Sequence, residues 1–244
     1  MNLSETDLPD LSPRRLHHGV HDMLRSRILD GTLSPGTRLR VNDLAAQLNI
    51  SAMPVREAIR ELEASGLVTS VPHRGAWVSR LDAGEIANLL ELRLILEPEA
   101  ARRAAPNIDY KRADMLHRHL KRLEQTARHR DRSAELLNSD EALQLAIFEA
   151  CNNPDLVAEI SRIWDRVRPY KLLHLKHGAD AAGPPVVTWD SEIVKACIAR
   201  DADAAAAKVR EPLERTQREL VEFTRRLSAR EAEMQGSRSA GGQR

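Results

Sequence analysis

The sequence predicts a mainly α-helical protein in two parts: a small N-terminal domain that ends in a β-hairpin, followed by a C-terminal antiparallel α-helical bundle. Three observations support this fold class. The 244 residues are 42% hydrophobic but only 3% aromatic, with 11 glycines and 12 prolines. Many segments consist of Ala, Leu, Glu and Arg, which favour helices. Apolar residues recur at helical spacing through most of the chain, apart from one stretch near residue 70 that alternates as strands do.

The charge is segregated along the chain. Lys and Arg total 37 and Asp and Glu total 36, for a net charge of +1. Residues 14–80 nevertheless hold ten arginines against six acidic residues, together with His17, His18, His21 and His73, whereas residues 81–228 carry a charge of −1. This excess is too small for a non-specific architectural DNA protein, which binds through bulk positive charge. It indicates a modestly basic domain followed by a neutral one.

The chain shows no signs of export or membrane insertion. It has no apolar run near the ~18 residues that a membrane span requires, and its N-terminus lacks the apolar core of a signal peptide. Cys151 and Cys197 have no CxxC spacing, so we expect both to be reduced and packed in helices. These features predict a soluble, cytoplasmic protein without a disulfide framework.

Three helices are predicted in the first domain, residues 13–80, after a disordered segment at 1–12. Ser12-Pro13 begins the first helix and Asp30-Gly31 ends it. A short amphipathic helix follows at 41–48. Ser51 is then expected to cap a third helix, Pro54 to Ser65, which Gly66 terminates.

A two-stranded hairpin completes the domain. Residues 67–71 and 76–79 alternate as strands around a turn at 72–75. Together these elements predict a winged helix-turn-helix, in which a helix fits the major groove of B-DNA and the hairpin reaches an adjacent groove or phosphates. Arg56 and Arg60 lie one turn apart on the third helix. The alternative is that they only pair with neighbouring glutamates, Glu57, Glu61 and Glu63.

Residues 38–45, 51–62, 66–68 and 72–78 resemble the DNA-binding domain of GntR-family transcription regulators, most clearly in the run PVREAIRELEASGLV. The resemblance implies that the start of the third helix and the wing tip touch the operator. The implied DNA-binding residues are Arg40, Asn42, Ser51, Met53, Arg56, Arg60, His73, Arg74 and Gly75. One departure is Ala52, where the family commonly has an arginine; the operator is therefore expected to differ from the usual one.

Six helices are predicted in the second domain, residues 81–228, before a disordered tail at 229–244. Asp82 and Glu85 form a capping-box pattern at the start of the first, which ends near Pro106. The others are expected at about 108–129, 133–151, 154–176, 187–199 and 202–228. Because Pro212 lies inside the last helix, we expect that helix to be kinked or to begin anew near Glu211.

The second domain is similar to the FCD effector domain of the FadR subfamily. The resemblance rests on Glu91-Leu-Arg93-x-x-Leu96-Glu97, Asp140-x-x-Leu-Gln144, Asn153-Pro-x-Leu156 and the segment IVKACIARDADAAAA. It implies a homodimer that binds a palindromic operator on double-stranded DNA. It also implies a small effector whose binding alters DNA affinity, such as an organic acid, sugar acid or amino-acid-like metabolite.

Many FCD domains hold Zn²⁺ or Ni²⁺, but this sequence departs from their ligand pattern. Asp140 matches the aspartate, whereas Gln144, Asp190 and Pro212 replace the three histidines. Amides and carboxylates are poor substitutes for imidazole at such a site, and proline offers no ligand. We therefore expect neither a bound metal nor another cofactor. His174 and His177 are three residues apart, but such a pair is more often simply exposed.

The resemblance implies a polar effector site in place of the metal. Arg93, Asp140, Gln144 and Asp190 are expected to converge inside the bundle, with Arg168 and Tyr170 at its mouth. Arg93 would bind a carboxylate or phosphate and the two aspartates a donor-rich or cationic group, which suits a zwitterion, an amino sugar or a hydroxylated compound. The alternative is that Arg93 pairs with Glu97 and that the aspartates are caps or surface residues.

These expectations favour a ligand-responsive transcription regulator that is not an enzyme. The rival from another class is a helical-bundle carboxylate enzyme in which Asp140 and Asp190 act as acid and base or hold a metal. No Glu-x-x-His pair occurs in the bundle and no nucleophile motif is present, and the first domain would then have no role.

Overall fold

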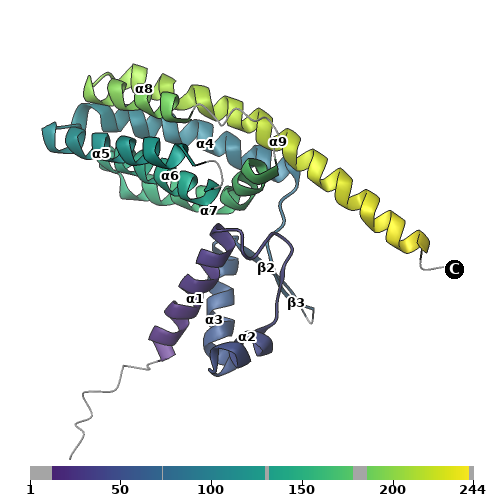
Figure 1. The fold of residues 1–244 in the computed structure, drawn as a ribbon. Coiled ribbons are helices and arrows are strands. Elements are labelled where there is room, and N and C mark those ends of the chain that lie inside the picture. Colours follow the sequence, from purple (N-terminus) through teal and green to yellow (C-terminus); the bar gives the residue numbers. More distant parts are fainter. Residues whose placement is uncertain (1–12, 73, 130–131, 178–185, 242–244) are drawn as a thin grey trace, which may run out of the picture. The chain divides into compact units, whose positions relative to one another are not determined.

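The structure is a computed structural model that describes residues 13–72, 74–129, 132–177 and 186–241. The chain divides into two compact units, residues 1–80 and 81–244 (Figure 1). Each unit has its own apolar core. The segment 1–12, predicted to be disordered, lies outside the described residues.

The first unit is built on three helices, α1 (Pro13–Leu29), α2 (Val41–Leu48) and α3 (Ala52–Ala64). α1 and α3 lie side by side (Figure 1). Fully buried side chains form the core of this unit, among them Leu24, Ile28, Val55 and Leu62. α3 begins at Ala52, two residues before the predicted start. Ser51 is its N-cap residue, but the predicted capping hydrogen bond from the Ser51 side chain is not formed.

A three-stranded antiparallel sheet joins these helices. It contains β1 (Arg38–Leu39), β2 (Val68–Val71) and β3 (Gly75–Val78) in the order β1-β3-β2. The hairpin of β2 and β3 was predicted, and its register pairs Val68 with Val78. β1 was not predicted, because a two-residue strand is too short to show an alternating pattern.

The second unit is all helical (Figure 1). Its elements are α4 (Ala83–Ala104), η2 (Ala105–Asn107), α5 (Tyr110–Ala127), α6 (Ser133–Phe148), η3 (Glu149–Cys151), α7 (Pro154–His177), α8 (Val186–Ile198) and α9 (Ala202–Gly241). The predicted capping box opens α4: Asp82 Oδ1 accepts from the Glu85 amide at 2.8 Å, and Glu85 Oε2 accepts from the Asp82 amide at 2.9 Å. The predicted fold class is therefore confirmed.

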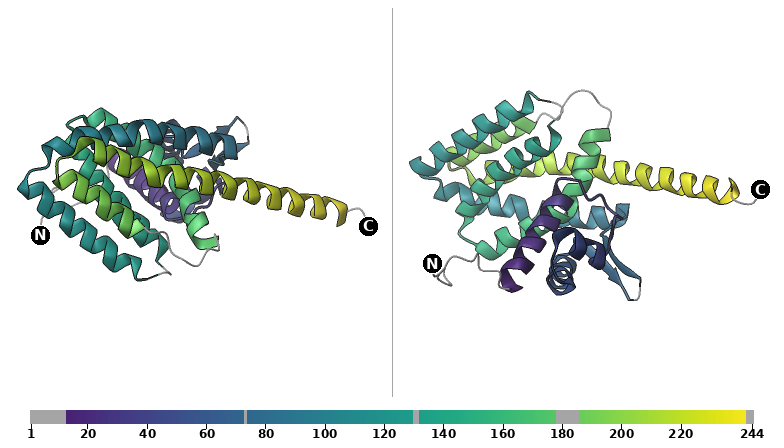
Figure 2. Two further views of the ribbon diagram at one scale, coloured as in Figure 1. Left: turned by 90° about the horizontal axis from the view of Figure 1, so that it is seen from above. Right: turned by 60° about the horizontal axis from the view of Figure 1, so that its bottom comes forward.

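α4 packs along α9; α6 and α7 pack on α4, α8 packs on α9, and α5 lies against α6 and α8 (Figures 1 and 2). The bundle core is apolar and includes the fully buried Leu116, Leu123, Leu143 and Phe148. Cys151 and Cys197 are buried as free thiols in this core. No helix in the described part of the chain combines the length and apolarity needed to cross a membrane.

The last helix differs from the expectation in two respects. Of the two outcomes expected at Pro212, the start of a new helix near Glu211 is wrong, because α9 runs unbroken through Pro212. Proline removes one backbone hydrogen bond, but Val209 and Leu213 are buried on either side of it and hold the helix in the bundle. The tail expected from residue 229 also continues α9 as far as Gly241, because Ala229-Arg-Glu-Ala-Glu-Met is a helix-forming run. Only residues 242–244 of that tail lie outside the described chain.

Candidate functional site

The exposed face of α3 carries the two arginines predicted to reach DNA. Arg56 and Arg60 are both exposed, while the intervening Ala58 and Ile59 are buried in the core. Arg60 Nη1 donates to Glu57 Oε1 at 2.6 Å. Within the described residues Arg56 has no hydrogen-bond or ion-pair partner. Arg60 therefore pairs with a neighbouring glutamate, whereas Arg56 does not.

The remaining predicted DNA-binding side chains lie at helix starts and in the wing. Met53 is 64% exposed at the beginning of α3, next to the exposed Ser51. Arg40 and Asn42 are exposed at the beginning of α2, where Arg40 Nη1 is 3.6 Å from Asp43 Oδ2. His73 lies outside the described residues.

Arg38 supports the wing, a role that the sequence did not reveal. Its Nη2 atom donates to the carbonyl oxygen of Arg74 at 2.7 Å, and its guanidinium lies over the Trp77 ring at 5.5 Å. Gly75 follows with φ of +114°, a conformation that other residues rarely adopt. The turn is thus held by a charge-assisted hydrogen bond while the exposed Arg74 side chain stays available.

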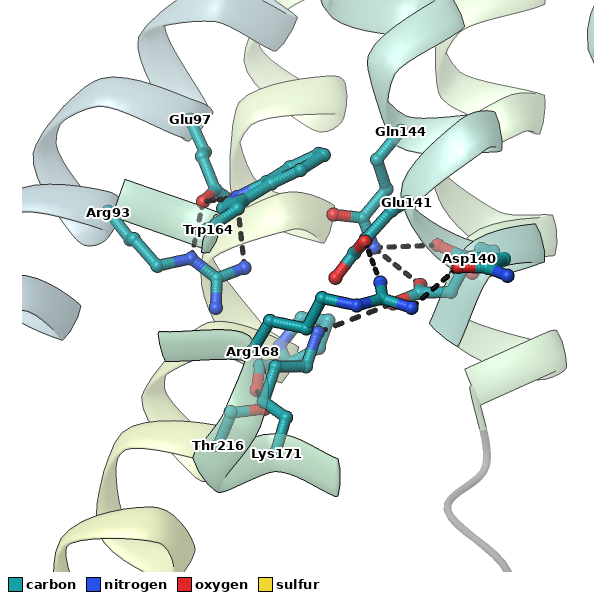
Figure 3. Close-up of polar contacts among 12 residues, drawn as sticks. Arg93, Glu97, Asp140, Glu141, Gln144, Trp164, Arg168, Lys171 and Thr216 are labelled. Carbon is teal, nitrogen blue, oxygen red and sulfur yellow. Dashed lines mark hydrogen bonds and ion pairs between the residues drawn. The ribbon is translucent and has the colours of Figure 1, made fainter. Parts of the chain in front are cut away.

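The second unit contains a group of buried and partly buried polar side chains with the exposed Asn138 at its edge, which we call the central polar cluster (Figure 3). Its members are Arg93, Glu97, Asn138, Asp140, Glu141, Gln144, Trp164, Arg168, Lys171 and Asp190, contributed by α4, α6, α7 and α8. Arg93 Nε donates to Glu97 Oε1 at 2.5 Å, and Trp164 Nε1 donates to the same oxygen at 2.6 Å. Arg93 and Glu97 are 3% and 0% exposed, so this ion pair is fully buried. Arg93 Nη1 has no partner.

A second part of the central polar cluster joins Asp140, Gln144 and Asp190. Gln144 Nε2 donates to Asp140 Oδ1 at 2.7 Å and lies 3.5 Å from Asp190 Oδ1. Lys171 Nζ is 3.5 Å from Asp140 Oδ2. Asp190 Oδ2 is buried and has no partner. The aspartates are therefore interior residues, and the surface alternative for them is wrong.

Burial raises the pKa of two acids in the cluster. The pKa of Asp190 lies well above its ordinary value because the side chain is desolvated and faces the negative charge of Asp140. The pKa of Glu141 is also raised by burial, against the opposing effects of Lys171 and Arg168. Asp190 therefore favours the neutral form that can donate a proton.

Arg168 and Tyr170 were both predicted to line the mouth of the effector site. Arg168 Nη1 donates to Glu141, and its Nη2 donates to Asn138 Oδ1 at 2.5 Å. Arg168 thus belongs to the cluster (Figure 3). Tyr170 lies elsewhere: its hydroxyl accepts from the Leu81 amide at 2.6 Å, within a separate apolar cluster.

The structure brings together five of the six predicted effector residues and adds others that the sequence reasoning missed. Glu141, Trp164 and Lys171 were not predicted. Lys171 lies one turn beyond Arg168 on α7, which was an available signal. Trp164 has no local signal, because its contact with Glu97 joins residues 67 positions apart.

The residues at the family's metal positions do not fit Zn²⁺ or Ni²⁺. The Gln144 amide nitrogen donates to Asp140, so this side chain turns a donor toward the aspartates. Pro212 offers no side-chain ligand. His174 Nε2 is 3.9 Å from Glu219 and the ring packs on Phe223, while His177 is exposed at the end of α7.

Comparison with known families identifies both units. A model described as "Bacterial regulatory proteins, gntR family" matches residues 16–78. A model of the FCD domain matches residues 88–215, just over half of the chain.

Relatives cover most of the chain. The HTH-type transcriptional repressor RspR of Escherichia coli (strain K12) is 26% identical over 227 residues, 91% of this chain and 94% of that protein. The Nta operon transcriptional regulator of Aminobacter aminovorans is 31% identical over 134 residues, 55% of this chain and 63% of its own length. The solved structure of E. coli McbR/YncC matches 85% of this chain and 97% of its own with a TM-score of 0.74; at 23% identity it shows the fold.

Proposed function

Since the chain belongs to the GntR family of regulatory proteins and carries an FCD domain, it is a DNA-binding transcription regulator, and we propose that a small zwitterionic metabolite in the central polar cluster controls its affinity for a palindromic operator. The observation that carries the proposal is a buried guanidinium nitrogen and a buried carboxyl oxygen that both lack hydrogen-bond partners, Arg93 Nη1 and Asp190 Oδ2.

The chemistry of the central polar cluster supports a ligand with both an anionic and a cationic group. Buried polar atoms are costly unless they are paired. Arg93 Nη1 is a free donor that suits a carboxylate, and its guanidinium faces the side chains of α6 and α7 (Figure 3). Asp190 Oδ2 has no hydrogen-bond partner, and as the carbonyl oxygen of a neutral carboxyl group it can accept from an ammonium or hydroxyl group. A ligand of the amino-acid type satisfies both.

The charge balance of the cluster favours the same class. It contains three cationic side chains, Arg93, Arg168 and Lys171, and four acidic ones, Glu97, Asp140, Glu141 and Asp190. With Asp190 protonated the charges cancel. A dianion or a simple amine would add net charge to a buried site, whereas a zwitterion would not.

DNA recognition is assigned to exposed residues of the first unit, together with His73, which lies outside the described residues. Arg56 is the base-reading candidate because its side chain is exposed near the start of α3 and is not engaged by a neighbour. Arginine binds guanine with two hydrogen bonds, which supplies specificity. Arg40, Asn42, Ser51, Met53, Arg60, His73, Arg74 and Gly75 would position the domain on phosphates and groove edges.

A homodimer would give the operator its palindromic symmetry. On α4, Leu92 and Ile95 are 45% and 59% exposed and lie three residues apart, hence on one face. Apolar side chains grouped on one surface mark interaction sites. Leu92→Glu should therefore shift the protein toward monomer in sedimentation-velocity analysis.

Coupling between effector and DNA requires only that the effector bind two conformations unequally. Operator affinity then changes by the ratio of the two effector affinities. The enzyme alternative gains no support, because the relatives RspR and the Nta operon regulator are named as a transcriptional repressor and a transcriptional regulator.

A thermal-shift screen tests the effector class, with amino acids, organic acids, amines and sugar acids run with and without EDTA. We expect stabilisation by a zwitterion that Arg93→Met/Glu97→Gln abolishes. The control Arg103→Met/Glu99→Gln alters an exposed pair of the same spacing on α4. Stabilisation by simple anions alone, or an undiminished response in the buried variant, would overturn the assignment.

A further inference from the structure

We infer that His17, His18 and Glu61 form a binding site for a divalent transition-metal ion that joins α1 to α3. One ligand atom from each residue lies within 4.8 Å of the other two, the single such group of His, Cys, Asp or Glu found in the described residues. The two histidines are adjacent on α1 and the glutamate comes from α3. Neither the proposed DNA contacts nor the effector site uses these three side chains.

The spacing of the candidate ligands suits a metal ion. Nε2 of His17 is 3.0 Å from Oε2 of Glu61, and the rings of His17 and His18 have centroids 4.8 Å apart. Zn²⁺ binds imidazole nitrogen and carboxylate oxygen at about 2.0–2.2 Å in tetrahedral geometry, which puts neighbouring ligand atoms about 3.3 Å apart. The distance between His17 Nε2 and Glu61 Oε2 is already close to this ligand–ligand separation. His18 is exposed, so its ring can turn toward the pair.

Nε2 of His17 also lacks a hydrogen bond. The atom is buried and has no hydrogen-bond partner, because its close contact with Glu61 lies outside hydrogen-bond geometry. In the tautomer that leaves Nε2 without a proton, its lone pair and those of the carboxylate oxygen repel each other at this distance. A cation bound between them replaces that repulsion with two ligand bonds.

The three candidate ligands lie where a metal ion would cross-link the packed helices α1 and α3 near one end of their contact. His17 precedes Val20 and Leu24 by three and seven residues, so it continues the buried face of α1 that packs on α3. The Glu61 side chain is 48% exposed, which leaves the ion open to solvent and to water as a further ligand. Two imidazoles and one carboxylate favour Zn²⁺, Co²⁺ or Ni²⁺ over Mg²⁺ and Ca²⁺.

The test is a titration of the full chain, without a histidine tag, by Zn²⁺ in competition with a chromophoric chelator. We expect one ion per chain, together with a rise in the thermal midpoint. His18→Ala and Glu61→Gln should each weaken binding at least tenfold. Both residues are exposed, so these variants should fold. His21→Ala and Glu57→Gln change the same residue types on the same helices outside the group and should leave binding unchanged.

A second readout separates this site from others in the chain. Co²⁺ bound by these ligands should give visible d–d absorption that disappears in His18→Ala and persists in Asp140→Asn. The inference is overturned if wild type takes up no Zn²⁺ at micromolar concentrations. It is also overturned if Asp140→Asn, rather than His18→Ala or Glu61→Gln, removes binding. If wild type and Glu61→Gln bound Zn²⁺ equally well, Glu61 would not be a metal ligand and its contact with His17 would be only an ion pair. That result would also contradict the inference.

Discussion

Arg93 and Glu97 form an ion pair that is completely enclosed in the bundle, one helical turn apart on α4, with Trp164 bound to the same carboxylate oxygen. A pair of this kind contributes little to stability compared with apolar side chains of equal volume, but removing one partner leaves a buried charge. Because single and double substitutions of the pair should differ in their effect on stability, they test the energetics of the central polar cluster.

Removal of one partner should destabilise the protein strongly. Arg93→Met leaves Glu97 charged and buried, and we expect a loss of about 3–5 kcal/mol in the free energy of unfolding. Arg93→Met/Glu97→Gln keeps an acceptor for the Trp164 indole and should recover most of that loss. Urea denaturation monitored by circular dichroism measures both variants. Equal losses in the single and double variants would contradict the argument.

Arg56 should carry sequence-specific DNA affinity. Loss of a bidentate contact to a base costs about 1–3 kcal/mol, so we expect Arg56→Ala to weaken operator binding roughly 5–150-fold. Fluorescence anisotropy at fixed salt measures this against operator and against unrelated DNA. Arg27→Ala removes the same charge from an exposed position at the end of α1 and is the control. A similar loss in both variants would point to bulk electrostatics instead.

Asp190 should make stability depend on pH in a defined direction. Its pKa in the folded protein is raised above the unfolded value of about 3.9. At pH values between the unfolded and the folded pKa, Asp190 is therefore protonated in the native state and ionised in the unfolded state. The stabilisation is fully present below the unfolded pKa and is lost as the pH rises through the folded pKa. Asp190→Asn mimics the protonated form and should flatten this part of the profile, as measured by urea denaturation at a series of pH values.

The exposed Asp114, which pairs with Arg118 on α5, provides the matched control. In the Asp114→Asn variant, the free energy of unfolding should still fall as the pH rises through the folded pKa of Asp190. If wild type and Asp190→Asn gave parallel profiles, the proton would not reside on Asp190.

Cys197 should be inert in the folded protein. Burial raises the pKa of its thiol to about 12, so the reactive thiolate is rare at pH 8. We expect alkylation by iodoacetamide to be on the order of a thousandfold slower than for a free thiol, whose pKa is about 8.5. Mass spectrometry of the modified peptide measures the rate. Labelling at the free-thiol rate without urea would show that this part of α8 opens readily.

Local patterns predicted the elements that depend on local interactions. The capping box of Asp82 and Glu85 spans three residues and formed as expected. The two strands of the wing were likewise visible as alternation. Arg38 was missed because its partners, Arg74 and Trp77, come from a distant hairpin, and the two-residue strand β1 exists only through pairing with β3.

The central polar cluster was predicted in part for the same reason. The family pattern brought Asp140, Gln144 and Asp190 together, and the i,i+4 spacing signalled Arg93 with Glu97. Trp164 enters the cluster only through helix packing, which the sequence alone does not specify, whereas Lys171 could have been found from its position one turn beyond Arg168. The new helix expected near Pro212 does not form, because burial of the flanking residues holds α9 together despite the missing backbone hydrogen bond.

The hydrogen bond from the Leu81 amide to the Tyr170 hydroxyl ties the first residue of the second unit to α7. The same helix carries Arg168 and Lys171, whose side chains reach the central polar cluster. Any displacement of α7 would therefore be passed to Leu81, the residue at which the second unit begins. Through Tyr170, the helix that carries part of the central polar cluster is tied to the start of the connection between the two units.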